Sequence, residues 1–367
     1  MRAPRALTAA FVASLLWLCL GRDAKSETPA LLPLPAAAKI DPKKAELGRM
    51  LFFDKRLSGD AEIACADCHS PAQAWSDGLP LSRGYPGTSY FRRTPSLLDV
   101  ALRRRLYWDG RLDGRDMDSL VRDHLTEAHF MNADGRLLIE RLRQVPEYEA
   151  AFKAAMGGEP SFGRILGAIT AFVATLRTDG GALDRHLSGK KKLTGKELEG
   201  YQLFTGKAAC TRCHSGATLT DESFHVTGVP ESGAVFSEPL RHITFRRFFK
   251  TMGVADYAQL RADVGRYAQT QVESDRGAFR TPSLRNVGAQ AAFMHNGSLA
   301  TLSDVVAFYD AGAGVGPDNR PRLTPLGLSG AQKAALVAFL KVLKGSSTEV
   351  VPPASLPAYA PRKLGEN

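Results

Sequence analysis

Two short segments of the chain carry the same arrangement of cysteine and histidine. They read CADCHS at residues 65–70 and CTRCHS at residues 210–215, and the only other cysteine of the chain is Cys19. In a Cys-x-x-Cys-His motif, each thiol can form a thioether to a vinyl group of haem, and the histidine becomes an axial ligand of the iron. The repeated motif therefore predicts two covalently bound haem c groups and redox chemistry.

Two other uses of paired cysteines explain this pattern less well. Zinc ribbons place their Cys-x-x-Cys knuckles within ~20 residues of each other, much closer than these two motifs. A redox dithiol gives no role to the histidine that follows each second cysteine. We assign haem attachment and iron ligation to Cys65, Cys68 and His69 in the first motif, and to Cys210, Cys213 and His214 in the second.

The first residues have the features of a secretory signal. Arg2 and Arg5 precede an apolar run at residues 6–20, which is shorter than the ~20 residues that a membrane-spanning helix needs. We expect residues 1–25 to be a signal peptide, export to the periplasm, and no stable membrane insertion of the mature protein. An uncleaved anchor is the alternative. A lipoprotein anchored at Cys19 is disfavoured, because a leucine precedes that cysteine.

The chain carries a formal net charge of +10. Such a charge can steer an acidic redox partner toward the surface, although it is equally compatible with an ordinary solvated surface. No segment resembles a nucleic-acid-binding motif, so we expect no nucleic acid partner.

The two halves of the chain repeat more than the haem motifs. KAELGRMLFFDKRL precedes the first motif and KELEGYQLFTGKAA the second, and aligning Gly48 with Gly200 also aligns their leucine and phenylalanine residues. Both segments have the apolar spacing of an amphipathic helix. After the motifs, TPSLLDVALRRRLYWDGRL and TPSLRNVGAQAAFMHNGSL repeat each other without gaps.

These repeats, without any sustained strand alternation, predict a mainly α-helical fold of two cytochrome c-like haem domains related by duplication. We expect the N-terminal domain at residues 26–185 and the C-terminal domain at residues 186–367, joined by a linker near RTDGGALDRHLSGKKKLTGKE. Other expected features are an apolar helix at Phe162–Leu176, an extra segment at Phe224–Arg276 and a closing helix at Ala331–Leu343.

The motifs resemble those of the bacterial dihaem cytochrome c peroxidases and the related MauG proteins. The resemblance covers nearly the whole mature chain, through the haem motifs, TPSL followed by YWDGR, and FRTPSLRNV followed by FMHNGSLATLSDVVAFY. It implies that the His69 haem reacts with hydrogen peroxide and that the His214 haem handles electrons. It also implies that Trp108, in YWDGR, relays electrons between the haems. A packed core tryptophan is the alternative.

The resemblance also concerns the sixth ligand of the second haem. The ordinary peroxidases have a methionine there, a soft ligand that raises the reduction potential. Continuing the motif without gaps brings this position to Tyr309, the substitution that marks MauG-like members. A phenolate is a hard anionic donor and should lower the potential. The alternatives are Met294 as the ligand, or Tyr309 as an ordinary buried residue.

The chain departs from the family pattern around the first haem. The loop after its motif has no histidine before His124, so we expect an iron position open to peroxide. The family's distal glutamate, in an N-P-x-E-M pattern, is replaced by Phe130 before Met131. Cleavage of peroxide needs an acid–base group. Glu127 and His124 are the nearest replacements, and we expect Glu127 to serve.

A further departure concerns calcium, which the family binds between its haem domains with an asparagine and two carbonyl groups. Arg93 stands at the asparagine position. A guanidinium cannot bind calcium, but it can donate to the same carbonyls, those of Gln290 and Ala292. We expect calcium to be absent or weakly bound.

These observations predict an exported dihaem c-type peroxidase. Its electrons would come from a small redox protein, a cytochrome c or a cupredoxin. One alternative is a MauG-like oxidase that uses peroxide to oxidise aromatic residues of a partner protein. Another is a dihaem electron carrier with no catalytic role.

Overall fold

The computed structural model of the chain describes residues 30–315, 321–347 and 350–359. Helices dominate these ranges, and each strand is only two residues long, which confirms the expected mainly α-helical fold. Within the same ranges, no helix combines the length and the apolar composition that crossing a membrane requires. The predicted signal peptide, residues 1–25, lies outside the described residues.

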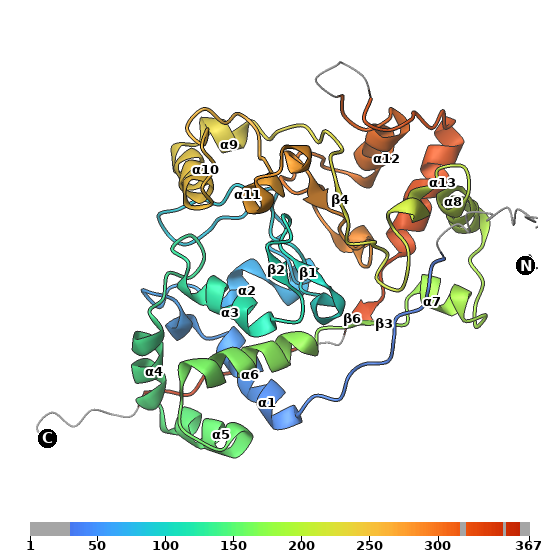
Figure 1. The fold of residues 1–367 in the computed structure, drawn as a ribbon. Coiled ribbons are helices and arrows are strands. Elements are labelled where there is room, and N and C mark those ends of the chain that lie inside the picture. Colours follow the sequence, from blue (N-terminus) through green and yellow to red (C-terminus); the bar gives the residue numbers. More distant parts are fainter. Residues whose placement is uncertain (1–29, 316–320, 348–349, 360–367) are drawn as a thin grey trace, which may run out of the picture.

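The first half of the chain surrounds the first haem motif (Figure 1). Its first helix begins at Pro42, where the carboxylate of Asp41 accepts hydrogen bonds from two backbone N–H groups of the first turn. The α-helices of this half are α1 Pro42–Phe52, α2 Cys65–Cys68, α3 Met117–Thr126, α4 Gly135–Arg143, α5 Pro146–Met156 and α6 Phe162–Ala174. The short 3-10 helices are η1 Lys55–Leu57, η2 Pro71–Gln73 and η3 Val100–Leu102.

The second half repeats this plan with an addition. Its α-helices are α7 Ala182–Leu187, α8 Gly195–Thr205, α9 Ala234–Ser237, α10 Pro239–Thr251, α11 Tyr267–Thr270, α12 Leu302–Asp310 and α13 Gly330–Val342. Its 3-10 helices are η4 Cys210–Arg212, η5 Glu273–Asp275 and η6 Val287–Ala289. The expected closing helix is α13, and the expected extra segment contains α9, α10 and α11. The predicted linker is itself structured, because it contains α7.

Three antiparallel strand pairs occur in the described residues, a local hairpin and two pairs that join distant parts of the chain. They are β1 Arg105–Leu106 with β2 Leu112–Asp113, β3 Thr178–Asp179 with β6 Ser346–Ser347, and β4 Phe224–His225 with β5 Phe279–Arg280. The β4–β5 pair closes the base of the extra segment. The β3–β6 pair brings the segment after α13 to the middle, between the two halves (Figure 1).

The apolar side chains form three clusters. The first draws its buried residues from positions 47–176, and the second from positions 183–343 together with Leu31. The third joins the extra segment to Tyr90 and Phe91 of the first half. The predicted domain boundary at residues 185 and 186 stays a prediction.

Both halves are built on the same close packing of two helices. A Cβ atom on Gly48 of α1 would lie 1.9 Å from the carbonyl oxygen of Ala168 in α6. A Cβ atom on Gly200 of α8 would lie 2.1 Å from the carbonyl oxygen of Ala335 in α13. Only glycine allows backbones to approach this closely. The glycine alignment found in the sequence therefore corresponds to one helix contact made twice.

The loops after the haem motifs also repeat in their backbone conformation. Asp99 and Asn286, at equivalent positions of the TPSL repeats, both have a left-handed conformation, with φ of 58° and 60°. A 3-10 helix follows each of them, η3 and η6 respectively. Gly110 and Gly297, also at equivalent positions, have nearly the same backbone conformation, with φ of 63° and 62°.

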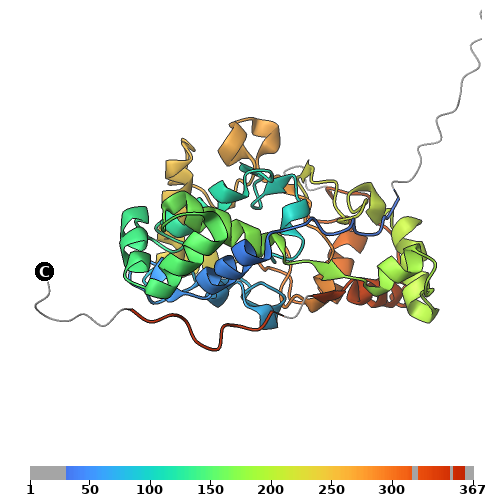
Figure 2. The same cartoon turned by 90° about the horizontal axis from the view of Figure 1, so that it is seen from below.

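The ends of the described chain cross between the halves (Figure 2). Leu31 pairs with Gly216 beside the second haem motif, after which the chain runs to α1 in the first half. Beyond α13 the chain returns to the first half, where Arg49 donates a hydrogen bond of 2.7 Å to the carbonyl oxygen of Val351. The two halves are therefore held together by crossing segments as well as by their facing loops.

The glycine contact gives a test of the helix packing. Replacing Gly48 by alanine should destabilise the haem-loaded protein by about 1–3 kcal/mol, because the added methyl group forces the two backbones apart. Gly163, in the first turn of α6, is the matched control, since a Cβ atom there meets nothing within 4 Å. Its alanine variant should be neutral or slightly stabilising. Denaturant unfolding measures both, and equal stabilities would contradict the packing argument.

Candidate active site around two haem motifs

The first haem motif presents its histidine in a fixed orientation. His69 ends α2, and its backbone N–H donates to the carbonyl oxygen of Cys65 at 2.9 Å. Its ring nitrogen Nδ1 donates to the carbonyl oxygen of Trp75 at 3.1 Å. The proton is therefore on Nδ1, and Nε2 keeps a lone pair for a metal ion.

The second motif repeats this arrangement. The backbone N–H of His214 donates to Cys210 at 2.9 Å, and Nδ1 donates to the carbonyl oxygen of Leu219 at 3.1 Å. The carbonyl groups that orient the two histidines belong to Trp75 and Leu219, which are 1% and 0% exposed. Both residues have positive φ, 61° and 54°. A left-handed conformation costs about 1–3 kcal/mol in a bulky residue, so the surrounding packing must impose it.

A cavity opens in front of the first motif. Most of its wall is apolar, and Cys65, Cys68 and His69 lie on it. Covalent attachment of haem requires free cysteines beside a space of this kind, and both cysteines are free thiols. The residues present therefore fit a haem group, with His69 as its axial ligand.

His124 lies opposite His69 across this cavity. It comes from the last turn of α3, and the centres of the two imidazole rings are 6.3 Å apart. Its ring stacks between Tyr107 and Phe130, at 5.5 and 4.4 Å. Burial first, and then the proximity of His69, lowers the pKa of His124 to about 4, so the ring is neutral at neutral pH.

Glu127, the expected acid–base group, points elsewhere. It ends α3, and its carboxylate lies 3.0 Å from Nε2 of His129. It is not among the residues that line the cavity. Burial raises its pKa, but the hydrogen bond with His129 and the charge of Arg111 outweigh this and hold the pKa below its usual value. Of the two candidates, the geometry therefore favours His124.

Trp108 lines the cavity of the first haem motif and connects it to the second half. Its indole N–H donates to the carbonyl oxygen of Arg93 at 2.9 Å. Its own carbonyl accepts from the backbone N–H of Arg280 at 2.9 Å. The next residue, Thr281, accepts a hydrogen bond of 2.7 Å from Thr220, six residues beyond His214. Two hydrogen bonds, joined through the Arg280–Thr281 peptide, thus connect Trp108 to the loop that follows the second motif.

A buried charge network that the sequence analysis missed holds this tryptophan loop. Arg92 is 1% exposed and donates to Asp109 at 2.6 Å and to Asp263 at 2.7 Å. Arg111 also reaches Asp109, at 3.2 Å. Because Asp109 follows Trp108 directly, these ion pairs fix the loop against the extra segment. The only sequence signal was the first arginine in FRRTP, and nothing in the sequence linked it to Asp263, 171 residues away.

Tyr309 lies beside the second motif, in the last turn of α12. Burial, and then the nearby sulfur atoms of Cys213 and Cys210, raises the pKa of its phenol to about 12. An isolated phenol here stays protonated at neutral pH. A phenolate at this position therefore requires a bound cation, and the iron of a second haem would supply one.

Arg93 is 8% exposed and bridges the two halves. Its guanidinium donates to the side-chain oxygen of Gln290, one of the two residues expected, but through the side chain and not the backbone carbonyl. Burial lowers its pKa to about 10, which leaves it charged at neutral pH. A fixed cation therefore occupies the position where the family pattern places a calcium ligand.

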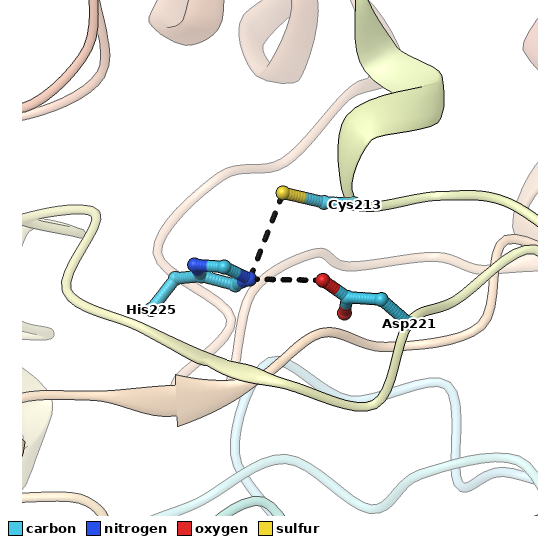
Figure 3. A group of neighbouring side chains, drawn as sticks. All are labelled: Cys213, Asp221 and His225. Atoms are coloured by element: carbon cyan, nitrogen blue, oxygen red, sulfur yellow. Dashed lines mark hydrogen bonds and ion pairs between the residues drawn. The ribbon is translucent and has the colours of Figure 1, made fainter. Parts of the chain in front are cut away.

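Cys213, Asp221 and His225 form a cluster that resembles a metal site (Figure 3). Nε2 of His225 lies 3.6 Å from the sulfur of Cys213 and 3.2 Å from the carboxylate of Asp221. A cysteine binds metal as a thiolate, and a thioether to haem removes that form. We therefore assign Cys213 to haem attachment and not to a metal site with His225 and Asp221.

Comparisons with known proteins extend over nearly the whole chain. A family model described as di-haem cytochrome c peroxidase matches residues 42–192. The chain is 46% identical over 346 residues to cytochrome-c peroxidase IdrP2 of Denitromonas iodatirespirans, covering 94% of this chain and 92% of that protein. It is 33% identical over 335 residues to methylamine utilization protein MauG of Methylorubrum extorquens, covering 90% and 86%. A solved MauG-like protein associated with microbial copper homeostasis has a TM-score of 0.72 at 28% identity, covering 87% of this chain and 95% of that one.

The Arg93 contact predicts that the protein does not depend on calcium. A chelator or added calcium should leave the unfolding temperature unchanged, because a dication is repelled by the buried guanidinium. Replacing Arg93 by alanine should destabilise the protein by about 1–3 kcal/mol, since the oxygen of Gln290 loses its donor. Arg136, a surface arginine whose side chain is 91% exposed, is the control and should have little effect. A chelator-induced drop in the wild-type unfolding temperature would contradict this prediction.

Proposed function

We propose that this chain, which belongs to the di-haem cytochrome c peroxidase family, is an exported enzyme that reduces hydrogen peroxide at the haem of its first motif. The observation that carries the proposal is the cavity in front of Cys65, Cys68 and His69, with the free Nε2 of His69 beside it. Each peroxide takes up two electrons and two protons and leaves two water molecules.

The haem held by Cys65, Cys68 and His69 supplies the redox chemistry that cleaves the oxygen–oxygen bond. The protein orients His69 through Trp75 and surrounds the reacting face with apolar side chains, which exclude bulk water. His124 faces the same space with a neutral imidazole, so it can accept the proton of peroxide and return it to the leaving oxygen. Glu127 and His129 lie behind it and are candidates for proton resupply.

Cys210, Cys213 and His214 would hold a second haem, which would supply electron transfer between an outside donor and the first site. Trp108 is the proposed relay, because it lines the cavity of the first motif and its carbonyl accepts from the backbone N–H of Arg280. The next residue, Thr281, is hydrogen-bonded to Thr220 in the loop after the second motif. The donor is a small redox protein, such as a cytochrome c or a cupredoxin. The net positive charge of the chain favours an acidic partner. The predicted signal peptide places the reaction in the periplasm.

Tyr309 favours a second candidate function. If its phenolate binds the second iron, that haem has a low potential and suits storage of an oxidising equivalent better than entry of electrons. The protein would then be a MauG-like oxidase that uses peroxide to oxidise aromatic residues of a partner protein. Turnover of peroxide with reduced cytochrome c distinguishes the two functions, because only the first consumes the reduced donor.

The assignment of the reaction to the first haem gives a direct test. His69→Ala should abolish peroxide consumption while the second haem keeps its spectrum, because the first iron loses its protein-held axial ligand. His186→Ala is the control. This histidine accepts a hydrogen bond from Leu193 in the second half and lies outside the cavity. Unchanged turnover in a haem-loaded His69→Ala protein would refute the assignment.

The role of Tyr309 can be tested by measuring the reduction potential of the second haem. Tyr309→Met should raise the reduction potential of the second haem, because a soft thioether replaces a hard anionic donor. Axial ligation is one of the factors that spread haem potentials over ~0.8 V, so the shift should be easy to resolve. Tyr201→Phe, at a tyrosine packed against the second apolar cluster, is the control. Redox titration that gives equal potentials for wild type and Tyr309→Met would leave Tyr309 as a core residue.

A further inference from the structure

Three of the eight histidines make the same kind of hydrogen bond. Within the part of the chain that the structure describes, Nδ1 donates to a backbone carbonyl in His69, His214 and His124. The acceptor for His124 is the carbonyl oxygen of Leu120, at 2.9 Å. A carbonyl oxygen can only accept, so in each ring the proton is on Nδ1 and the lone pair is on Nε2. Metal-binding histidines characteristically have this arrangement.

Other histidines of the chain are held differently. Nδ1 of His186 accepts a hydrogen bond from a backbone N–H, which is the opposite polarity. His129 and His225 each face a carboxylate through Nε2. The shared hydrogen bond therefore groups His124 with the two histidines of the haem motifs.

The position of His124 agrees with this grouping. Metal–imidazole bonds are ~2 Å long, so two rings that bind one metal ion from opposite sides through Nε2 have centres about 6 Å apart. The centres of His69 and His124 are 6.3 Å apart, and both residues line the same cavity. A histidine that acted only on a peroxide molecule bound to the iron would have to stand further from His69, because the peroxide would lie between them.

The other candidate ligands near this cavity do not fit the axial position. Met131 lies on the wall, but its sulfur is 3.8 Å from the sulfur of Cys65, at the edge where the thioether forms. The carboxylate of Glu127 is engaged with His129. Tyr107 places its hydroxyl 3.2 Å from Nδ1 of His124, on the side of that ring away from Nε2.

We propose that His124 is the second axial ligand of the first haem iron in the resting protein, bound through Nε2 opposite His69. The proposal rests on the haem assignment within the proposed function and deepens it. It differs from the sequence expectation of an open iron, which considered only the loop that follows the motif. His124 comes instead from α3, and Leu120, Tyr107 and Phe130 hold its ring in place.

This ligation has a consequence for reactivity. An imidazole cannot bind iron and accept a proton from peroxide at the same time, so His124 must leave the iron before peroxide enters. External ligands then bind only to the fraction of molecules in which His124 is displaced. With that fraction at about 1–10%, ligand affinity is lowered about 10- to 100-fold relative to a protein without His124.

The test uses the haem-loaded, full-length exported protein in its ferric state. Electron paramagnetic resonance should show only low-spin haem in the wild type. In His124→Ala, half of the low-spin signal should be lost and a high-spin signal should replace it, and added imidazole should restore the low-spin form. Cyanide should bind the variant about 10- to 100-fold more tightly than the wild type. His242→Ala and His186→Ala are the controls and should keep the wild-type spectrum.

His124→Met is a second variant that keeps a ligand and a similar volume in case the alanine protein does not fold. It should remain low-spin, with a raised potential at the first haem. A wild-type protein with high-spin first haem, or a His124→Ala spectrum equal to wild type, would overturn the proposal. If that wild type still consumed peroxide, the proposed function would stand without the ligand. A spin change in His124→Ala without peroxide turnover in any form would support the ligand and refute the peroxidase.

Discussion

The hydrogen bonds from histidine Nδ1 to buried backbone carbonyls are the constraint on which the two redox sites depend. Each haem motif fixes only that a histidine follows a cysteine. The direction of its Nε2 comes from Trp75 in the first half and Leu219 in the second. Both acceptors adopt left-handed conformations that bulky residues avoid, and burial in the two apolar cores maintains them. Packing of the two cores therefore holds each histidine in the orientation that a metal ligand needs.

The same cores hold the helices that lead into the two haem loops. The α1–α6 and α8–α13 contacts place each haem loop at the end of a helix pair, at a separation that only glycine permits. Between the halves, Arg92 and Arg111 together balance the charges of Asp109 and Asp263, and so hold the Trp108 loop in a buried position. Buried charges are tolerated only when each is paired, so removal of one of these residues would leave its partner uncompensated.

The two irons would then have unlike surroundings although the halves share one plan. Near the first, Tyr107 and Phe130 enclose a neutral His124, which in our proposal is a displaceable ligand. Near the second, Tyr309 would offer an anionic donor that is stable only when it is bound to metal. A displaceable ligand suits the iron that must admit a small oxidant. A fixed anionic ligand suits an iron that changes oxidation state without binding substrate.

The sequence by itself determined the features whose chemistry is local in the chain. Haem attachment needs two cysteines and a histidine within five residues, and helices α1, α6, α8 and α13 follow from apolar spacing. Only the tertiary structure decided which way side chains of α3 point. It turned His124 toward His69 and Glu127 toward His129, and it joined Arg92 to Asp263. These choices depend on packing between segments far apart in the chain, for which a single sequence carries no spacing rule.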